Sequence, residues 1–255
     1  MHTPIPVCGN RSEGDGGHHL DREVDVVVLG TGAAGLTAAL TAASVAVFEK
    51  GGTTVGGTTA VSGGIVWIPA HNRAAGGELT VEDALKYLEA QSLGGVMDRE
   101  LVETFVRTGP EMLDYIEAHS ALHFEVAEGF PDYKPELPGG QPGGGRSLNA
   151  KPFDLAALGE WASRITSFPP IDFSNVGIDA ETRARIHAAV DDMDGDYCVA
   201  GTALIAGLLK SLLDLGVTPP VTEARAVELI GSASGITGVR ITHGGKDIRY
   251  EPQRR

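Results

Sequence analysis

The sequence predicts an α/β fold, and three features of the 255-residue chain support this class. Residues 24–29 form an apolar, β-branched run that is typical of a strand buried on both faces. A glycine-rich turn, a helix rich in alanine and leucine over 36–43, and a second apolar strand over 45–49 follow. Near the end of the chain, three short strands separated by glycines predict an antiparallel meander. A βαβ unit combined with further helices and strands places the chain in the α/β class.

The composition limits the classes of partner. Lys and Arg total 20 against 34 Asp and Glu, which gives a net charge of −14, so nucleic acid and anionic membranes are repelled on average. Hydrophobic residues make up 42% of the chain, which is enough for a folded core. The 35 glycines are therefore expected in tight turns and at places where the backbone closely approaches another group.

The cysteines and the N-terminal segment predict a cytoplasmic protein. Cys8 and Cys198 lie far apart and form neither a disulfide framework nor a CxxC pair, as expected in a reducing compartment. Residues 1–23 contain no apolar signal core and predict a weakly ordered leader, in which His18 and His19 are a surface pair rather than metal ligands. No window reaches the run of about 18 apolar residues that a transmembrane helix needs.

The middle of the chain predicts two helices and a long loop. Thr80 is the expected N-cap of a helix over 80–91, with Asp83 completing an approximate capping box. A second helix is expected over 98–119, broken or kinked at Gly109-Pro110. The glycine- and proline-rich stretch 130–152 predicts a loop.

The last third predicts one helix and the meander. Residues 202–215 place four leucines on one helical face, and Gly216 lies at the expected C-terminal end. Strands are expected near 225–230, 237–242 and 246–250, with Gly235 and the Gly244-Gly245 pair in the turns.

The first glycine-rich turn carries the motif GxGxxG between a strand and a helix, the context that the motif requires. Gly30 permits the tight turn, Gly32 lets the backbone reach a pyrophosphate, and Gly35 lets helix and strand pack closely. The helix N-terminus supplies N–H groups and partial positive charge. Glu49, at the end of the next strand, would accept hydrogen bonds from a ribose; the alternative is a solvated carboxylate. These features predict dinucleotide binding.

The spacing within this unit is short. Gly30 and Glu49 are 19 positions apart, and residues 42–44 contain no glycine to turn the chain. Either the helix ends a turn early or loop residues are missing, and backbone strain is expected there.

A second glycine-rich stretch, residues 51–64, favours a flavin over a nicotinamide, because small and hydroxyl-bearing residues suit a backbone that follows an extended cofactor. With this stretch, the chain resembles the FAD-dependent fumarate reductase and 3-ketosteroid Δ1-dehydrogenase flavoproteins. The residues that carry the resemblance are Gly30 to Gly35, Glu49-Lys50, the run from Gly56 to Pro69, the run from Pro131 to Gly140, Gly145 to Leu148 and Gly201 to Leu204.

The resemblance implies a Rossmann-like FAD-binding domain of the glutathione-reductase type, over 24–255, with helical insertions and a β-meander. It implies FAD as cofactor and a small-molecule substrate, a steroid or a dicarboxylate. The implied cofactor-binding residues are Gly30, Gly32, Ala33, Ala34, Gly35, Glu49, Lys50, Gly56, Gly57, Thr58, Thr59, Ser62, Gly63, Gly64 and Ala226. Tyr133 is the position that matches a tyrosine of the family's substrate pocket; otherwise it only orders its loop.

The resemblance also includes departures. Relatives have a few more residues near Ala43-Ser44 and are much longer than this chain, which looks like an N-terminal fragment without the substrate-capping domain. The expected function is FAD-dependent oxidoreduction of the 3-ketosteroid Δ1-dehydrogenase type, with hydride passing from a substrate carbon to the flavin and desaturation of a carbon–carbon bond. The alternatives are a fumarate reductase-like flavoprotein and an inactive FAD-binding remnant. The general base is expected outside this chain, and no oligomeric state is predicted.

Other candidates are weaker. His119 and His123 have the spacing of a helical metal pair but lack a further ligand nearby. The acidic turn 192–196 mimics the start of a calcium loop, although Tyr197 stands where glycine is required. Trp67 and Trp161 are expected to pack, and no metal site is predicted.

Overall fold

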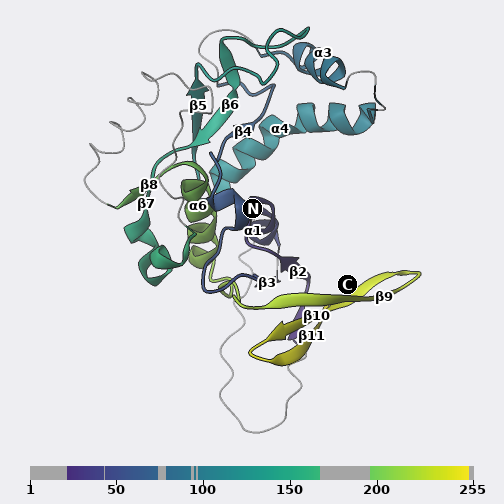
Figure 1. The fold of residues 1–255 in the computed structure, drawn as a ribbon, viewed down its shortest axis with the longest axis vertical. Helices are drawn as coiled ribbons and strands as arrows, with labels where there is room; N and C mark the ends of the chain where they lie inside the picture. Colours follow the sequence, from purple (N-terminus) through teal and green to yellow (C-terminus); the bar gives the residue numbers. More distant parts are fainter. Residues whose placement is uncertain are drawn as a thin grey trace, which may run out of the picture.

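The computed structural model describes residues 22–42, 44–73, 79–92, 95, 97–166 and 196–252. A central helix, α6 (Ala200–Asp214), lies between two parts of the molecule (Figure 1). One part contains a small sheet and the helices α3 (Val81–Gln91) and α4 (Arg99–His119), and the other contains the meander. Helices and both parallel and antiparallel strands are present, as the predicted α/β class requires.

The predicted first strand is divided into two. β1 (Arg22–Val24) pairs in parallel with β11 (Lys246–Pro252) in the meander sheet, and β2 (Val26–Leu29) pairs in parallel with β3 (Val45–Phe48). The division falls at Asp25, whose N–H already donates to the Ser44 carbonyl at 3.1 Å. One extended segment therefore connects the two sheets, and the described strands begin at Arg22 rather than at residue 24.

The helix of the βαβ unit is short. α1 (Ala33–Thr41) has nine residues and ends two residues before the expected end at residue 43, which agrees with the first explanation of the short spacing, an early end of the helix. Ala42 adopts an extended conformation, with φ −86° and ψ 144°, so the expected strain is absent at that residue. Ala43 lies outside the described residues.

A three-stranded sheet stands above α6. Its order is β4 (Val66–Trp67), β6 (Gly144–Ala150) and β5 (Phe124–Glu128), all antiparallel. The expectation of a loop throughout 130–152 is therefore wrong for β6. Glycines and polar residues hid this strand, because its polar Arg146 and Ser147 are as deeply buried as its apolar Leu148.

Helices α3 (Val81–Gln91) and α4 (Arg99–His119) begin as predicted. Thr80 Oγ1 accepts from the Asp83 N–H at 3.0 Å, and Asp98 caps α4. A break or a kink was expected at Gly109-Pro110, and the break is wrong, because α4 continues through Pro110. The helix is buried on both sides of this proline, at Val106 before it and at Leu113 after it, and this packing offsets the hydrogen bond that proline cannot make.

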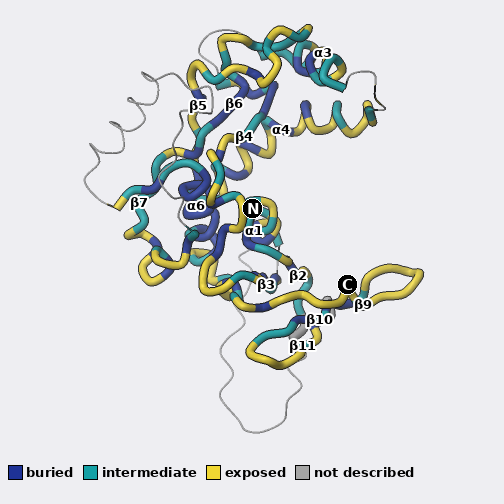
Figure 2. Tube along the Cα trace, viewed as in Figure 1, coloured by how far each residue is buried: buried dark blue, intermediate teal, exposed yellow. Residues whose placement is uncertain are grey.

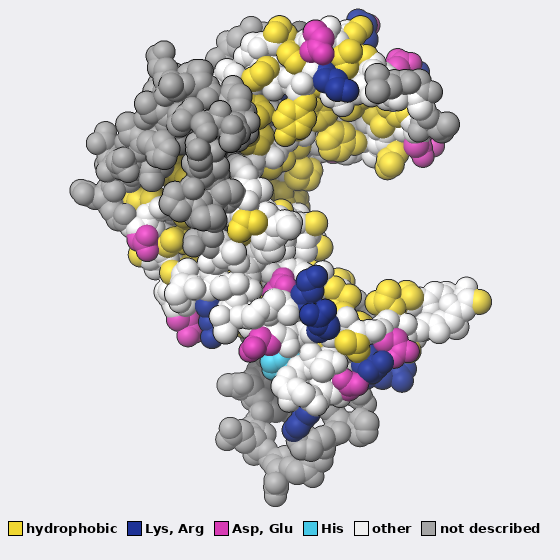
Figure 3. Space-filling view, in the orientation of Figure 1, with side chains coloured by type: hydrophobic (Ala, Val, Ile, Leu, Met, Phe, Trp, Pro, Cys, Tyr) yellow, Lys and Arg dark blue, Asp and Glu magenta, His cyan; other side chains and the backbone are white. Residues whose placement is uncertain are grey.

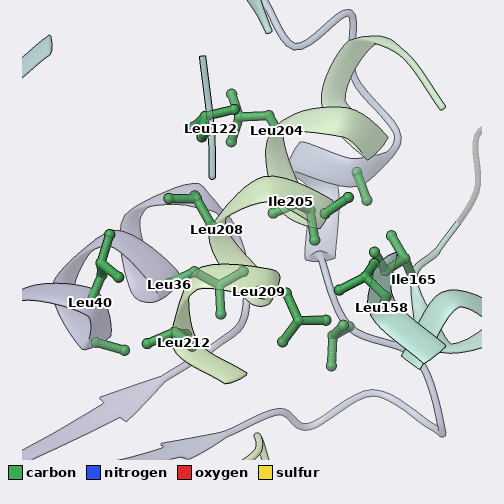
Figure 4. Packing of buried hydrophobic residues seen from close by; sticks show 14 of the residues in the cluster. Leu36, Leu40, Leu122, Leu158, Ile165, Leu204, Ile205, Leu208, Leu209 and Leu212 are labelled. Atoms are coloured by element: carbon green, nitrogen blue, oxygen red, sulfur yellow. The ribbon is translucent and has the colours of Figure 1, made fainter. Parts of the chain in front are cut away.

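Helix α6 forms the centre of the main core (Figures 2 and 4). Leu36 and Leu40 of α1, Leu122, and Leu158 and Ile165 at the far side all pack in the same cluster as α6. Leu204, Leu208 and Leu212 of the expected leucine face are buried, whereas Leu215, just past the end of α6, is 58% exposed. The rest of α6 is also buried nearly all round. β7 (Phe153–Asp154), the 3₁₀ segment η1 (Leu155–Arg164) and β8 (Tyr197–Cys198) lie beside it.

The meander is confirmed. β9 (Arg225–Ser232), β10 (Gly235–His243) and β11 (Lys246–Pro252) are antiparallel, in the sheet order β1-β11-β10-β9. Val221, just before β9, pairs in parallel with Phe48 of β3 and so extends the β2–β3 sheet. Figure 3 shows an open hollow between the α3–α4 part and the meander, with hydrophobic side chains on the upper wall. In the described part, no helix is long and apolar enough to cross a membrane.

Candidate cofactor site

The first glycine-rich turn joins β2 to α1. Gly30 has φ +106°, a left-handed conformation that side chains disfavour, and its N–H donates to the Phe48 carbonyl at 2.7 Å. A Cβ at Gly35 would overlap the carbonyl oxygen of Gly30 and press on Val28 at 3.2 Å. The two glycines thus let the first turn of α1 lie directly against the end of β2.

The N-terminus of α1 is electrostatically suited to an anion. Its N-cap is Gly32, which has no side chain to cap the helix, and its first turn contains no acidic residue. The Ala33 N–H donates to Thr59 Oγ1 at 3.1 Å, so this hydroxyl already touches the helix end. Free helix N–H groups and the helix dipole favour negative charge at such a place.

Glu49 is buried and held by three donors. Its side chain is 8% exposed; Oε2 accepts from the N–H and the hydroxyl of Thr31, at 3.0 and 2.6 Å, and Oε1 accepts from the Gly51 N–H at 2.8 Å. Burial raises the pKa of Glu49, but the Thr31 hydroxyl, the two N–H donors and the charge of Lys50 together outweigh burial and lower it. Glu49 is therefore an ionised acceptor. Since a carboxylate offers about four lone-pair positions, Oε1 keeps one for a further donor.

Thr31 is the residue that the sequence reasoning missed. It is fully buried, donates to Glu49, and accepts from the Gly56 N–H at 2.9 Å. Its hydroxyl thereby connects the first glycine-rich turn to the second glycine-rich stretch. The sequence did contain a signal for this role. Thr31 places a hydroxyl at a variable position of the motif, and Glu49 was predicted at the end of the neighbouring strand.

The second stretch lies between the N-termini of α1 and α6. It includes the one-turn helix α2 (Gly57–Ala60), whose Ala60 carbonyl accepts from Thr202 Oγ1 at 3.1 Å. The Ser62 carbonyl accepts from the Gly201 N–H, also at 3.1 Å. Of the predicted residues here, Gly57, Thr58 and Gly63 are exposed, Thr59 and Ser62 are half-buried, and Gly56 and Gly64 are buried.

A hollow of about 440 Å³ opens beside Glu49, where β3 ends. Lys50, Gly51 and Gly52 line it on one side, and Arg225, Val227 and the Gly244-Gly245 turn line it on the other. Ala226, the remaining predicted residue, is exposed and stands opposite Ile241 between two lining residues of β9. Lys50 and Arg225 bring two positive charges to this hollow and Glu223 brings one negative charge, in a chain of net charge −14.

The structure separates the other candidates from this site. Tyr133 is 90% exposed and lies in the segment between β5 and β6. His119 ends α4 and His123 follows beyond it, so they are not a helical pair, and no group of three possible metal ligands occurs within the described residues. Trp161 and Cys198 are buried in the main core. Cys8, His18, His19, Asp192 and Asp194 lie outside the described residues.

These groups fit a dinucleotide chemically. Buried Thr31 fixes an ionised carboxylate for hydroxyl donors, the end of α1 suits a pyrophosphate, and exposed small residues border both. No acidic side chain caps α1 in competition with a phosphate.

Comparison with known proteins agrees with this chemistry. A family model described as "FAD binding domain" matches residues 25–255. The 3-oxosteroid 1-dehydrogenase of Mycolicibacterium smegmatis is 47% identical over 144 residues, which cover 54% of this chain and 25% of that protein. The 4-oxocyclohexanecarboxylate 2-dehydrogenase of Sinomonas cyclohexanicum is 38% identical over 237 residues, which cover 86% of this chain and 40% of that protein.

A solved structure shares the fold. The 3-ketosteroid delta1-dehydrogenase of Sterolibacterium denitrificans, in complex with 1,4-androstadiene-3,17-dione, superposes with a TM-score of 0.74 at 28% identity. The match covers 90% of this chain and 46% of that one, so the chain spans less than half the length of these relatives. The family model covers nearly all of the sequence, and the chain belongs to the FAD binding domain family.

Proposed function

We propose that this chain binds FAD as part of a dehydrogenase that oxidises a cyclic ketone, in the manner of the 3-oxosteroid 1-dehydrogenases. The observation that carries the proposal is the Glu49–Thr31–Gly56 connection, which joins an ionised carboxylate, the proposed ribose acceptor, to both glycine-rich segments. In this assignment the residues from 24 onward form one Rossmann-like FAD-binding domain of the glutathione-reductase type.

The chain's own residues would bind and orient the cofactor. The turn from Gly30 to Gly35 and the N-terminus of α1 would hold the pyrophosphate, and Glu49 would accept from the adenosine ribose through its remaining Oε1 position. Lys50, Ala226 and the adjoining hollow would take the adenosine end. The exposed members of the second stretch, Gly57, Thr58 and Gly63, would follow the cofactor toward its ring. When bound, FAD supplies an acceptor for hydride.

The substrate class follows from what the relatives share. One relative is named for 3-oxosteroids and the other for 4-oxocyclohexanecarboxylate, and both names describe a ring ketone. We infer a substrate of this kind for the whole protein, with Tyr133 as a substrate contact, and a cytoplasmic location remains our prediction.

Cofactor binding is tested first, without substrate. The 255-residue chain is purified, its flavin absorbance recorded, and FAD titrated into the flavin-free form. In Glu49→Gln, the amide NH₂ meets the donors of Thr31 or Gly51, so we expect FAD affinity to fall by about 10- to 100-fold. Glu125→Gln, an exposed change on β5, is the matched control and leaves affinity unchanged. A wild-type chain that neither carries nor takes up FAD would refute the proposal.

Substrate class is tested next on the FAD-loaded chain. Reduction of an artificial electron acceptor is measured with a 3-oxosteroid, with 4-oxocyclohexanecarboxylate and with succinate. Activity with a ring ketone but not with succinate supports the proposed class, and the opposite result favours the fumarate reductase-like alternative. An FAD-loaded chain inactive with all three supports binding without turnover.

A further inference from the structure

A buried ion pair lies outside the cofactor site. Arg146 of β6 and Asp132, in the segment between β5 and β6, are joined by Nη1 and Oδ2 at 2.8 Å, and their side chains are 0% and 2% exposed. The guanidinium lies near the rings of Trp67 and Tyr87, at 6.0 and 5.6 Å from their centroids. Within the described residues, Nε and Nη2 of Arg146 have no hydrogen-bond partner.

Stability alone does not explain this pair. Apolar residues of similar volume commonly replace a buried ion pair without loss, because desolvation offsets the Coulomb attraction. Two unmatched buried donors on Arg146 add to that cost. The role of the pair is therefore sought in the backbone conformation that it holds around Asp132.

Asp132 closes the loop that follows it. Its Oδ1 accepts from Trp67 Nε1 at 2.8 Å, and its Oδ2 accepts from the Gln141 N–H at 2.9 Å in addition to Arg146. Its own N–H donates to the Gln141 carbonyl at 3.2 Å. One carboxylate thus fixes both ends of the segment 132–141 to β4 and β6.

The backbone of Lys134, two residues after Asp132, is held by a separate hydrogen bond. The Lys134 N–H donates to Tyr87 Oη at 3.2 Å, and Tyr87, on α3, is 3% exposed and also receives Gln91 Nε2 at 2.7 Å. Tyr133 stands between these two anchored neighbours, and yet its own side chain is 90% exposed. The two hydrogen-bonded neighbours fix the backbone of Tyr133, but they bury little of its ring.

We propose that Asp132 and Arg146 are positioning residues that hold Tyr133 in place before a ligand arrives, with Tyr87 as the second anchor. Pre-organisation of this kind lowers the conformational entropy lost on binding. That the ligand is the ring ketone rests on the proposed function, whereas the anchoring of the backbone does not.

The first test separates anchoring from stability. In the full chain, the double variant Asp132→Leu with Arg146→Met removes both charges together, and we expect a lower melting temperature, because the Trp67 Nε1–H and the Gln141 N–H also lose their acceptor. Hydrogen exchange at the Lys134 and Gln141 amides is followed by NMR, with α6 amides as the internal reference. Relative to the α6 amides, we expect exchange to become about tenfold faster or more at Gln141, with a smaller increase at Lys134. Equal exchange rates in the variant and in wild type would overturn the proposal.

Two single variants keep the test decisive if the double variant does not fold. Tyr87→Phe removes only the hydroxyl, and we expect faster exchange at Lys134 but not at Gln141. Tyr133→Phe changes only an exposed group and leaves both exchange rates and the melting temperature unchanged. Faster exchange in Tyr133→Phe would show that the tyrosine orders its own loop, and it too would overturn the proposal.

A functional measurement follows with the FAD-loaded chain. Asp132→Leu with Arg146→Met is expected to raise KM for the ring ketone several-fold more than it lowers kcat, while FAD affinity stays at the wild-type value. Unchanged KM would show that the anchoring does not serve substrate binding. If the 255-residue chain binds FAD without turnover, the exchange measurements decide the anchoring by themselves.

Discussion

Thr31→Val tests the connection between the two glycine-rich segments. Valine keeps the branched shape of threonine but removes the hydroxyl, which is fully buried. The change deletes the 2.6 Å bond to Glu49 Oε2 and the acceptor of the 2.9 Å bond from the Gly56 N–H. No other part of the side chain is lost.

The expected cost can be worked from these two bonds. A hydrogen bond to an ionised group contributes about 1.5–3 kcal/mol, and an unsatisfied buried donor costs about 1–3 kcal/mol. Since the two bonds share one oxygen and partial relaxation is expected, we predict that the free energy of unfolding falls by about 2–4 kcal/mol. Thr31→Ser keeps the hydroxyl and loses one methyl group, so it should cost about 1 kcal/mol or less.

The loss of unfolding free energy in Thr31→Val should be larger at neutral pH than at acidic pH. The pKa of Glu49 lies below its ordinary value of 4.5, so the stability that its hydrogen bonds contribute is present above that value and is lost as the pH falls through the folded-state pKa. The Thr31 hydroxyl is one cause of the lowering, and without it the pKa of Glu49 rises. The difference between wild type and Thr31→Val should therefore be larger at about pH 7 than at about pH 3, where the Gly56 penalty remains.

Urea unfolding of wild type, Thr31→Val and Thr31→Ser at both pH values provides the measurement. The same proteins titrated with FAD should show weaker binding in Thr31→Val only. A valine variant as stable as the serine variant at neutral pH would refute the idea that this hydroxyl connects the segments. A stability difference independent of pH would refute the part that acts through Glu49.

Two further predictions concern packing and burial. Gly201→Ala should lower the free energy of unfolding by about 3 kcal/mol, measured with urea, because the new Cβ would overlap the Thr59 carbonyl oxygen. Gly63→Ala should change it by less than about 1 kcal/mol, because the new Cβ meets no atom within 4 Å. Equal effects of the two substitutions would contradict the close approach of α6 to the second glycine-rich stretch. Burial raises the pKa of the Cys198 thiol from 9.0 to about 12, so the free energy of unfolding should decrease as the pH rises from 9.0 toward 12. Cys198→Ala should lose less stability over that range. If wild type and Cys198→Ala lose stability equally, the thiol ionises freely in the folded protein.

The local elements followed from local chemistry. Thr80 with Asp83 marked the start of α3, and the Gly244-Gly245 pair marked the last hairpin, because caps and turns depend on side chains a few residues apart. The GxGxxG turn and Glu49 were identifiable for the same reason. Strand β6 was missed, because its buried positions include Arg146 and Ser147, whose partners come from distant segments.

The sequence by itself determined the βαβ unit, the meander and the cofactor class, since each depends on short-range spacing. Only the tertiary structure decided that Thr31 joins Glu49 to Gly56, that α6 is buried nearly all round, and that Asp132 and Arg146 anchor the backbone beside Tyr133. The contacts behind these three features span from 14 to about 140 positions along the chain. Such contacts form only when the whole chain packs, because the hydrogen-bond partner of a buried polar group depends on which distant segment lies next to it.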